Sequence, residues 1–90
     1  MKLIKFYGDA CPSCDRLAIL LNNAFPDAAE KMETINVSQA TGAEMDLVIE
    51  HGVMTTPTLL LLDDEGKEVS RYSGYETPRV AGIVAQFMEG

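Results

Sequence analysis

The spacing of hydrophobic residues along this chain predicts three helices and four strands. Two of the helices have the 3.6-residue period of a helix with one buried face. The first begins near Pro12, which suits a first helical turn, and ends at Pro26, which cannot continue it. Its expected buried residues are Cys14, Leu17, Ala18, Leu21 and Phe25. The last helix begins at Thr77-Pro78. Its expected buried residues are Val80, Ile83, Val84, Phe87 and Met88.

A third helix lies between these two. The sequence Thr41-Gly42-Ala43-Glu44 has the form of a capping box, which opens a helix. We expect this helix to bury Met45, Val48 and Ile49 and to end at Gly52.

Four strands complete the pattern, at residues 3–7, 32–37, 58–62 and 67–72. A tight turn at Asp63-Asp64-Glu65-Gly66 joins the last two into an antiparallel hairpin with a charged edge strand. The order β-α-β-α-β-β-α predicts an α/β fold, because strand–helix–strand units give a parallel portion with right-handed crossovers. We therefore expect a mixed four-stranded sheet with three helices on both faces, in one domain of residues 1–90.

Charge and composition narrow the set of partners. Seven basic and 14 acidic residues give a net charge of −7, and the basic residues form no patch, so no nucleic acid partner is expected. The acidity either keeps the protein soluble or steers it toward a basic partner surface. No apolar run approaches the ~18 residues that span a bilayer. The N-terminus has no secretory signal pattern, so we expect a cytoplasmic monomer that does not enter the membrane.

The two cysteines of the chain form one motif, Cys11-Pro12-Ser13-Cys14. A disulfide across so short a loop would stabilise the fold little, so chemistry explains this spacing better than stability does. Half of a zinc site is one alternative, but zinc takes four ligands and only His51 could add a nitrogen. A purely structural pair is the other alternative. We expect no metal and no bound cofactor, only a redox-active disulfide between Cys11 and Cys14.

The motif lies where a strand ends and a helix begins, which gives its cysteines different roles. Cys11 lies at the helix N-terminus, where free N–H groups and the helix dipole should hold its thiol pKa below the usual ~8.5. Pro12 supplies no N–H and stiffens the turn. Cys14 lies one turn further in, on the buried face. We therefore expect Cys11 to attack a substrate disulfide and Cys14 to resolve the mixed disulfide.

With these features the chain resembles the thioredoxin and glutaredoxin superfamily over nearly its whole length. The strand before the cysteine motif, Thr56-Pro57-Thr58, the Asp64-Glu65-Gly66 hairpin and Gly74 before the last helix carry the resemblance. It implies a thioredoxin-like fold and a cis Pro57 beside the cysteines, which leaves the Thr56 backbone free to pair with a substrate peptide. The residues that it implies in substrate binding are Pro12, Ser13, Thr56, Pro57 and Gly74.

The two branches of this superfamily are mixed in the sequence. Pro12 resembles the Cys-Pro-Tyr-Cys of glutaredoxins, although Ser13 replaces the tyrosine, and Ala10 stands where thioredoxins have tryptophan. Residues 56–66 are more similar to thioredoxins. The segment Ser73-Gly74-Tyr75-Glu76 lacks the Gly-Gly pair with which glutaredoxins commonly bind glutathione.

The resemblance therefore favours a thioredoxin-type electron donor that reduces disulfide-containing proteins and is itself reduced by an NADPH-linked thioredoxin reductase. A glutaredoxin that is reduced by glutathione is the alternative. Another alternative is a non-enzymatic thioredoxin-fold module that binds partners and senses redox state. An oxidase or isomerase would need an oxidising compartment, for which the sequence shows no signal segment.

Four further residues are candidate modulators of the cysteine pKa values. Lys5 occupies the position where thioredoxins resemble one another in a buried aspartate. It would favour a Cys14 thiolate if it lies nearby, and otherwise it extends to solvent. Tyr7 falls where the family carries an aromatic residue near the site, and core packing is its alternative role. Asp9 should oppose a thiolate, whereas Arg16 should favour one if its head reaches back and is otherwise a solvated helix residue.

Overall fold

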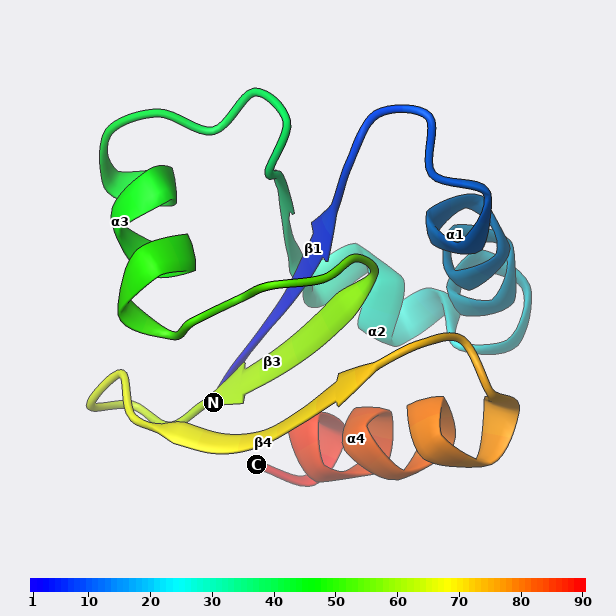
Figure 1. Ribbon diagram of the computed structural model, residues 1–90. Coiled ribbons are helices and arrows are strands. Elements are labelled where there is room, and N and C mark those ends of the chain that lie inside the picture. Colours follow the sequence, from blue (N-terminus) through cyan, green and yellow to red (C-terminus); the bar gives the residue numbers. More distant parts are fainter.

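The chain folds into a four-stranded sheet with helices on both faces, seen here in a computed structural model that describes residues 1–90 (Figure 1). The elements in chain order are β1 (Lys2–Tyr7), α1 (Pro12–Ala24), α2 (Pro26–Lys31), β2 (Glu33–Asn36), α3 (Ala43–Glu50), β3 (Thr58–Leu62), β4 (Glu68–Ser73) and α4 (Thr77–Glu89). Helix α3 lies on one side of the sheet, and α1, α2 and α4 lie on the other.

The strands lie in the order β2-β1-β3-β4. Strands β1 and β2 are parallel, with Ile4 opposite Glu33 and Tyr7 opposite Asn36. The connection between them is the strand–helix–strand crossover that the sequence predicts. Strand β3 runs antiparallel to β1 and pairs with the edge strand β4 in the antiparallel hairpin. The predicted mixed four-stranded sheet is therefore confirmed.

Strand β3 is buried along its whole length because helices cover both faces of the sheet there. This double burial explains why its sequence is a continuous run of leucines instead of an alternating pattern. The cluster on the side of α1 and α4 contains Leu3, Leu17, Leu21, Ala28, Leu59, Leu61, Val80, Ile83 and Val84. The cluster on the side of α3 contains Ile4, Phe6, Ile35, Ala40, Leu60 and Leu62.

The structure has four helices where the sequence analysis predicts three, because Pro26 begins a helix as well as ending one. Helix α1 stops at Ala24, and Pro26 is the first residue of the short helix α2. A proline is tolerated in a first helical turn because that turn needs no N–H donor. Buried Ala28 fixes α2 against the core, and the strand expected from residue 32 begins only at Glu33.

Helix α3 departs from its prediction at its start and on one face. Its N-cap residue is Gly42, with φ of 58°, and no side chain caps the helix, so the predicted capping box is wrong. Ile49 is 71% exposed because only one edge of this short helix meets the sheet. Met45, Leu47 and Val48 are the residues that pack against the core. The helix ends at Glu50 with His51 as its C-cap, and Gly52 directly after the cap has a φ of 59°, so this glycine terminates the helix as predicted.

Arg71 ties the edge strand to the end of α3. Its guanidinium donates hydrogen bonds to the carbonyl oxygens of His51 and Gly52 and is paired with Glu68 at 2.6 Å. The hydrogen bond from Arg71 lowers the pKa of Glu68, and the same bond raises the pKa of Arg71. These bonds hold the beginning of the segment that runs from α3 to β3, and this segment carries Thr56.

Helix α4 closes the side of the sheet opposite α3, and its stripe is correct for four of the five expected residues. Val80, Ile83 and Val84 are buried and Phe87 is partly buried, but Met88 is 42% exposed, since it lies in the last turn. Neither this helix nor any other in the structure is long and apolar enough to cross a membrane.

Candidate redox site at the start of helix α1

Cys11 and Cys14 are joined by a disulfide with 5.2 Å between their Cα atoms. Cys11 is the N-cap residue of α1, and its sulfur accepts a hydrogen bond from the backbone N–H of Cys14 at 3.2 Å. Cys14 is only 4% exposed, whereas Cys11 is partly exposed. Cys11 therefore presents the sulfur that a substrate can reach.

The turn before α1 places Cys11 at this position. It runs through Gly8, Asp9 and Ala10, and Ala10 has a positive φ of 49°. Such a conformation costs a residue with a side chain about 1–2 kcal/mol. Pro12 then occupies the first helical turn and is exposed, and Ser13 is half-buried. Since N–H groups at a helix start stabilise negative charge, a reduced Cys11 is held where its thiolate is favoured.

The segment before β3 lies against the Cys11 sulfur, as the resemblance implies. The Thr56–Pro57 peptide bond is cis. The carbonyl oxygen of Thr56 lies 4.0 Å from the Cys11 sulfur, and its hydroxyl lies 3.7 Å away. Neither the N–H nor the carbonyl of Thr56 takes part in a sheet or turn hydrogen bond. Both groups are therefore free to pair with an extended peptide beside the Cys11 sulfur.

Gly74 borders the same segment from the side of β4. Its N–H donates to the carbonyl oxygen of Pro57 at 3.1 Å. Its φ is 140°, and an added Cβ atom would lie 2.6 Å from the hydroxyl oxygen of Tyr72, so only glycine fits. The site residues predicted from the two halves of the sequence, Cys11 and Cys14 on one side and Thr56, Pro57 and Gly74 on the other, are thus brought together.

Thr58 supports the site in a way that its place in the Thr56-Pro57-Thr58 motif did not predict. It is 1% exposed, and its hydroxyl donates to the carbonyl oxygen of Thr55 and pairs with the Ser73 hydroxyl, each at 2.7 Å. These bonds fix the Thr56 segment to the end of β4. The available signal was a polar residue at the start of an otherwise fully apolar strand.

Lys5 and Tyr7 lie on the face of β1 that α1 covers, since they alternate with Ile4 and Phe6, which face α3. The Lys5 ammonium lies 5.7 Å from the centre of the Tyr7 ring and forms no ion pair. Burial lowers the pKa of Lys5 because it disfavours the charged form. The structure shows no hydrogen bond from Lys5 to either cysteine.

Replacing Lys5 by methionine should stabilise the protein at neutral pH, by up to about 1 kcal/mol because the ammonium is only half-buried. The folded chain releases the Lys5 proton at lower pH than the unfolded chain, so the cost of burying the charge is full at neutral pH. It fades as the pH rises toward the ordinary lysine pKa of 10.5. Urea unfolding at pH 7 and pH 10 measures this difference.

The same Lys5→Met variant tests the role of Lys5 toward the cysteines. Because the ammonium contacts Tyr7, the pH dependence of alkylation should be unchanged at Cys11 and at Cys14. A shift in the alkylation profile of Cys14 would show that Lys5 acts on the resolving sulfur.

Asp9 and Arg16 are both held by groups other than the Cys11 sulfur. The Asp9 carboxylate accepts hydrogen bonds from the side-chain amides of Asn36 and Gln39, the first at 3.0 Å. The guanidinium of Arg16 lies 5.5 Å from the centre of the Tyr75 ring. Tyr75 was given no role from the sequence, although an aromatic residue directly after Gly74 was a visible signal.

The zinc alternative depends on which possible ligands lie close together. No three His, Cys, Asp or Glu side chains gather into a group that could hold a metal ion. His51 lies at the end of α3, 4.0 Å from the carboxylate of Glu50.

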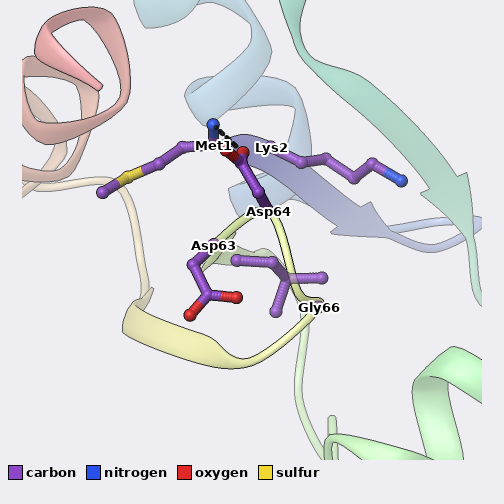
Figure 2. Close-up of a pocket in the computed structure, with 6 residues that line it drawn as sticks. Met1, Lys2, Asp63, Asp64 and Gly66 are labelled. Carbon is purple, nitrogen blue, oxygen red and sulfur yellow. Dashed lines mark hydrogen bonds and ion pairs between the residues drawn. The ribbon is translucent and has the colours of Figure 1, made fainter.

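A pocket of about 320 Å³ lies at the other end of the strands from the cysteines (Figure 2). It is lined by Met1, Lys2, Leu62, Asp63, Asp64 and Gly66. The terminal amine of Met1 is paired with Asp64 at 2.9 Å. The Asp63 carboxylate accepts backbone N–H bonds from Lys67 and Glu65, which lower its pKa and confirm the predicted tight turn. The carboxylates of this pocket are therefore used within the fold: Asp64 pairs with the chain's N-terminus, and Asp63 stabilises the turn before β4.

Comparison with known proteins agrees with this arrangement. The thioredoxin-like domain family matches residues 2–87. The SPbeta prophage-derived thioredoxin-like protein YosR of Bacillus subtilis (strain 168) is 32% identical over 76 residues, 84% of this chain and 85% of the relative. A solved thioredoxin-fold protein from Helicobacter pylori has a TM-score of 0.76 at 20% identity, covering 99% of this chain and 69% of that one.

Thioredoxin NaTrxh from Nicotiana alata has a TM-score of 0.69 at 26% identity, covering 93% of this chain and 70% of that one. The match to the thioredoxin-like domain family extends from β1 into α4. It therefore includes both the cysteine pair and the cis-proline segment that faces it. The chain belongs to the thioredoxin-like domain family.

Proposed function

We propose that this protein is a thioredoxin-type electron donor that reduces disulfide bonds in other proteins. The coarser property, thiol–disulfide exchange, is supported by the thioredoxin-like fold together with the Cys11–Cys14 disulfide. One observation carries the proposal further. The accessible sulfur of the pair lies at a helix N-terminus and beside the unpaired backbone of Thr56, where an extended peptide can bind.

The reaction that these groups support transfers two electrons. The Cys11 thiolate attacks one sulfur of the substrate disulfide, which forms a mixed disulfide and releases the other substrate sulfur as a thiolate. Cys14 then loses its proton to solvent and attacks the sulfur of Cys11. This step releases the second substrate thiolate, which takes up a proton, and forms the Cys11–Cys14 disulfide.

An NADPH-linked reductase must then return two electrons to this disulfide. We place the protein in the cytoplasm, because a donor must be kept reduced between turnovers and cytosolic thiols are kept reduced. Glutathione is the competing source of electrons, and Pro12 is the feature that favours it, since it resembles the motif of glutaredoxins.

An insulin assay tests the proposed function. Catalytic amounts of the protein should accelerate the reduction of insulin by dithiothreitol over dithiothreitol alone. A module that only binds partners or senses redox state would leave this rate unchanged.

The reduction potential, measured against glutathione buffers, separates the two branches. It should lie near the thioredoxin value of about −270 mV. A value of about −200 to −230 mV, with turnover by glutathione in place of thioredoxin reductase, would indicate a glutaredoxin.

A further inference from the structure

Arg16 and Tyr75 form a contact that the proposed reaction does not use. Arg16 belongs to α1 and Tyr75 to the connection between β4 and α4, and the guanidinium lies 5.5 Å from the ring centre. Both side chains are exposed, Tyr75 by 41%. A guanidinium held over an aromatic face keeps its N–H donors free for a ligand. Because the ring already restricts this side chain, less conformational entropy is lost when the ligand binds.

Two observations place this pair at the end of the molecule that carries the Cys11 sulfur. Arg16 is four residues after Pro12, so the two share one face of α1, one turn apart. Tyr75 follows Gly74, whose N–H is bonded to the carbonyl of Pro57. Since Thr56 touches the sulfur of Cys11, a peptide that pairs with Thr56 passes within reach of both side chains.

Arg16 provides an isolated positive charge on α1. The chain carries a net charge of −7, and Arg16 is the only basic residue of the helix that bears the cysteines. Arg16 forms no ion pair, and neither do Lys5, Lys31 and Arg79, whereas Lys2, Lys67 and Arg71 are each paired with a glutamate. An unpaired, pre-oriented guanidinium beside the site is a receptor for a carboxylate that a substrate brings.

We propose that the Arg16–Tyr75 pair is a specificity contact that binds an acidic side chain next to the cysteine attacked by Cys11. This inference rests on the proposed reduction of protein disulfides and names a substrate preference within it. Substrates with Asp or Glu beside the target cysteine should react faster than neutral ones despite the repulsion from the acidic surface as a whole.

Arg79 provides a matched control because it forms a contact of the same kind elsewhere. Its guanidinium lies 5.7 Å from the Tyr72 ring, and it borders the groove between β4 and α4. Arg79→Gln and Arg16→Gln each remove one positive charge from an exposed arginine that contacts a tyrosine ring. Any difference between the two variants therefore reports position instead of net charge.

The experiment uses three disulfide-linked peptide dimers that are identical except for Glu, Gln or Lys after the cysteine. Each dimer is mixed with the reduced protein, and single-turnover oxidation is followed by acid quench and mass spectrometry. The rate ratio of the Glu peptide to the Gln peptide should fall about two- to fivefold in Arg16→Gln, as expected for an exposed ion pair, and should not change in Arg79→Gln. Tyr75→Ala should lower the ratio and Tyr75→Phe should retain it.

Three other results would contradict either the specificity contact or the proposed function. Equal ratios in wild type and Arg16→Gln would overturn the specificity contact while leaving the reductase intact. An equal fall in Arg79→Gln would show that net charge alone sets the preference, which also overturns it. Failure of the wild type to reduce any of the three peptides would instead count against the proposed function.

Discussion

Replacing Cys14 by serine should turn the protein from a catalyst into a covalent trap. In this variant Cys11 remains exposed at the N-terminus of α1, so its attack on a substrate disulfide continues. The mixed disulfide then persists because the buried sulfur that would displace the substrate is gone. Turnover of insulin should fall at least about 100-fold. A complex of protein and substrate that dithiothreitol cleaves should appear on a non-reducing gel.

Cys11→Ser is the matched variant, since it removes the other sulfur by the same change. It should lose turnover to the same extent and form no complex with the substrate. The reduced wild-type protein gives a second check, because iodoacetamide at neutral pH should modify Cys11 well before Cys14, which is 4% exposed. Equal trapping by both variants, or equal alkylation of both sulfurs, would contradict the division of roles.

The second large effect is on stability. Leu17→Ala should lower the free energy of unfolding by about 2–5 kcal/mol, because Leu17 is fully buried and its truncation leaves a cavity beneath α1. A small domain has only about 5–15 kcal/mol of stability in total, so the variant should unfold at much lower urea concentration. Urea titration of the oxidised form, followed by circular dichroism, measures the change.

Ile19→Ala is the control for Leu17→Ala, since it truncates a side chain of equal carbon number two residues away in the same helix. Ile19 is 60% exposed, so its loss should change stability by no more than about 0.5 kcal/mol. A similar loss in both variants would mean that α1 does not pack on the sheet as the structure shows.

The periodicity of the sequence was sufficient to predict the buried residues of those helices that pack one face against the sheet. The stripe of α1 predicted buried Cys14, Leu17 and Leu21, and that of α4 predicted buried Val80, Ile83 and Val84. Residues 58–62 were predicted as a strand, but the structure showed that helices cover both of its faces. The periodicity missed the short helix α2, and it failed at the start of α3 and on one face of that helix. Gly42 starts α3 without the expected cap, and Ile49 faces solvent because the sheet offers this helix only one narrow contact.

In the candidate site, too, some residues could be placed from the sequence and others could not. The resemblance brought Cys11, Pro57 and Gly74 to one place, because the strand order of a known fold fixes where each element ends. Lys5 and Arg16 could not be assigned in this way. Each has a long flexible side chain, and its partner, Tyr7 or Tyr75, depends on the space left by surrounding packing.

By itself, the sequence determined that one cysteine stands at the start of an amphipathic helix, with a second cysteine one turn inside. This follows from local spacing, since a helix repeats every 3.6 residues whatever surrounds it. Only the tertiary structure decided what lies against that sulfur, namely the free backbone and the hydroxyl of Thr56. The buried hydroxyl of Thr58 holds this segment through its bonds to Thr55 and Ser73. Thr56 and Thr58 are distant from Cys11 in the sequence, and only the closed sheet brings their segment to the start of α1.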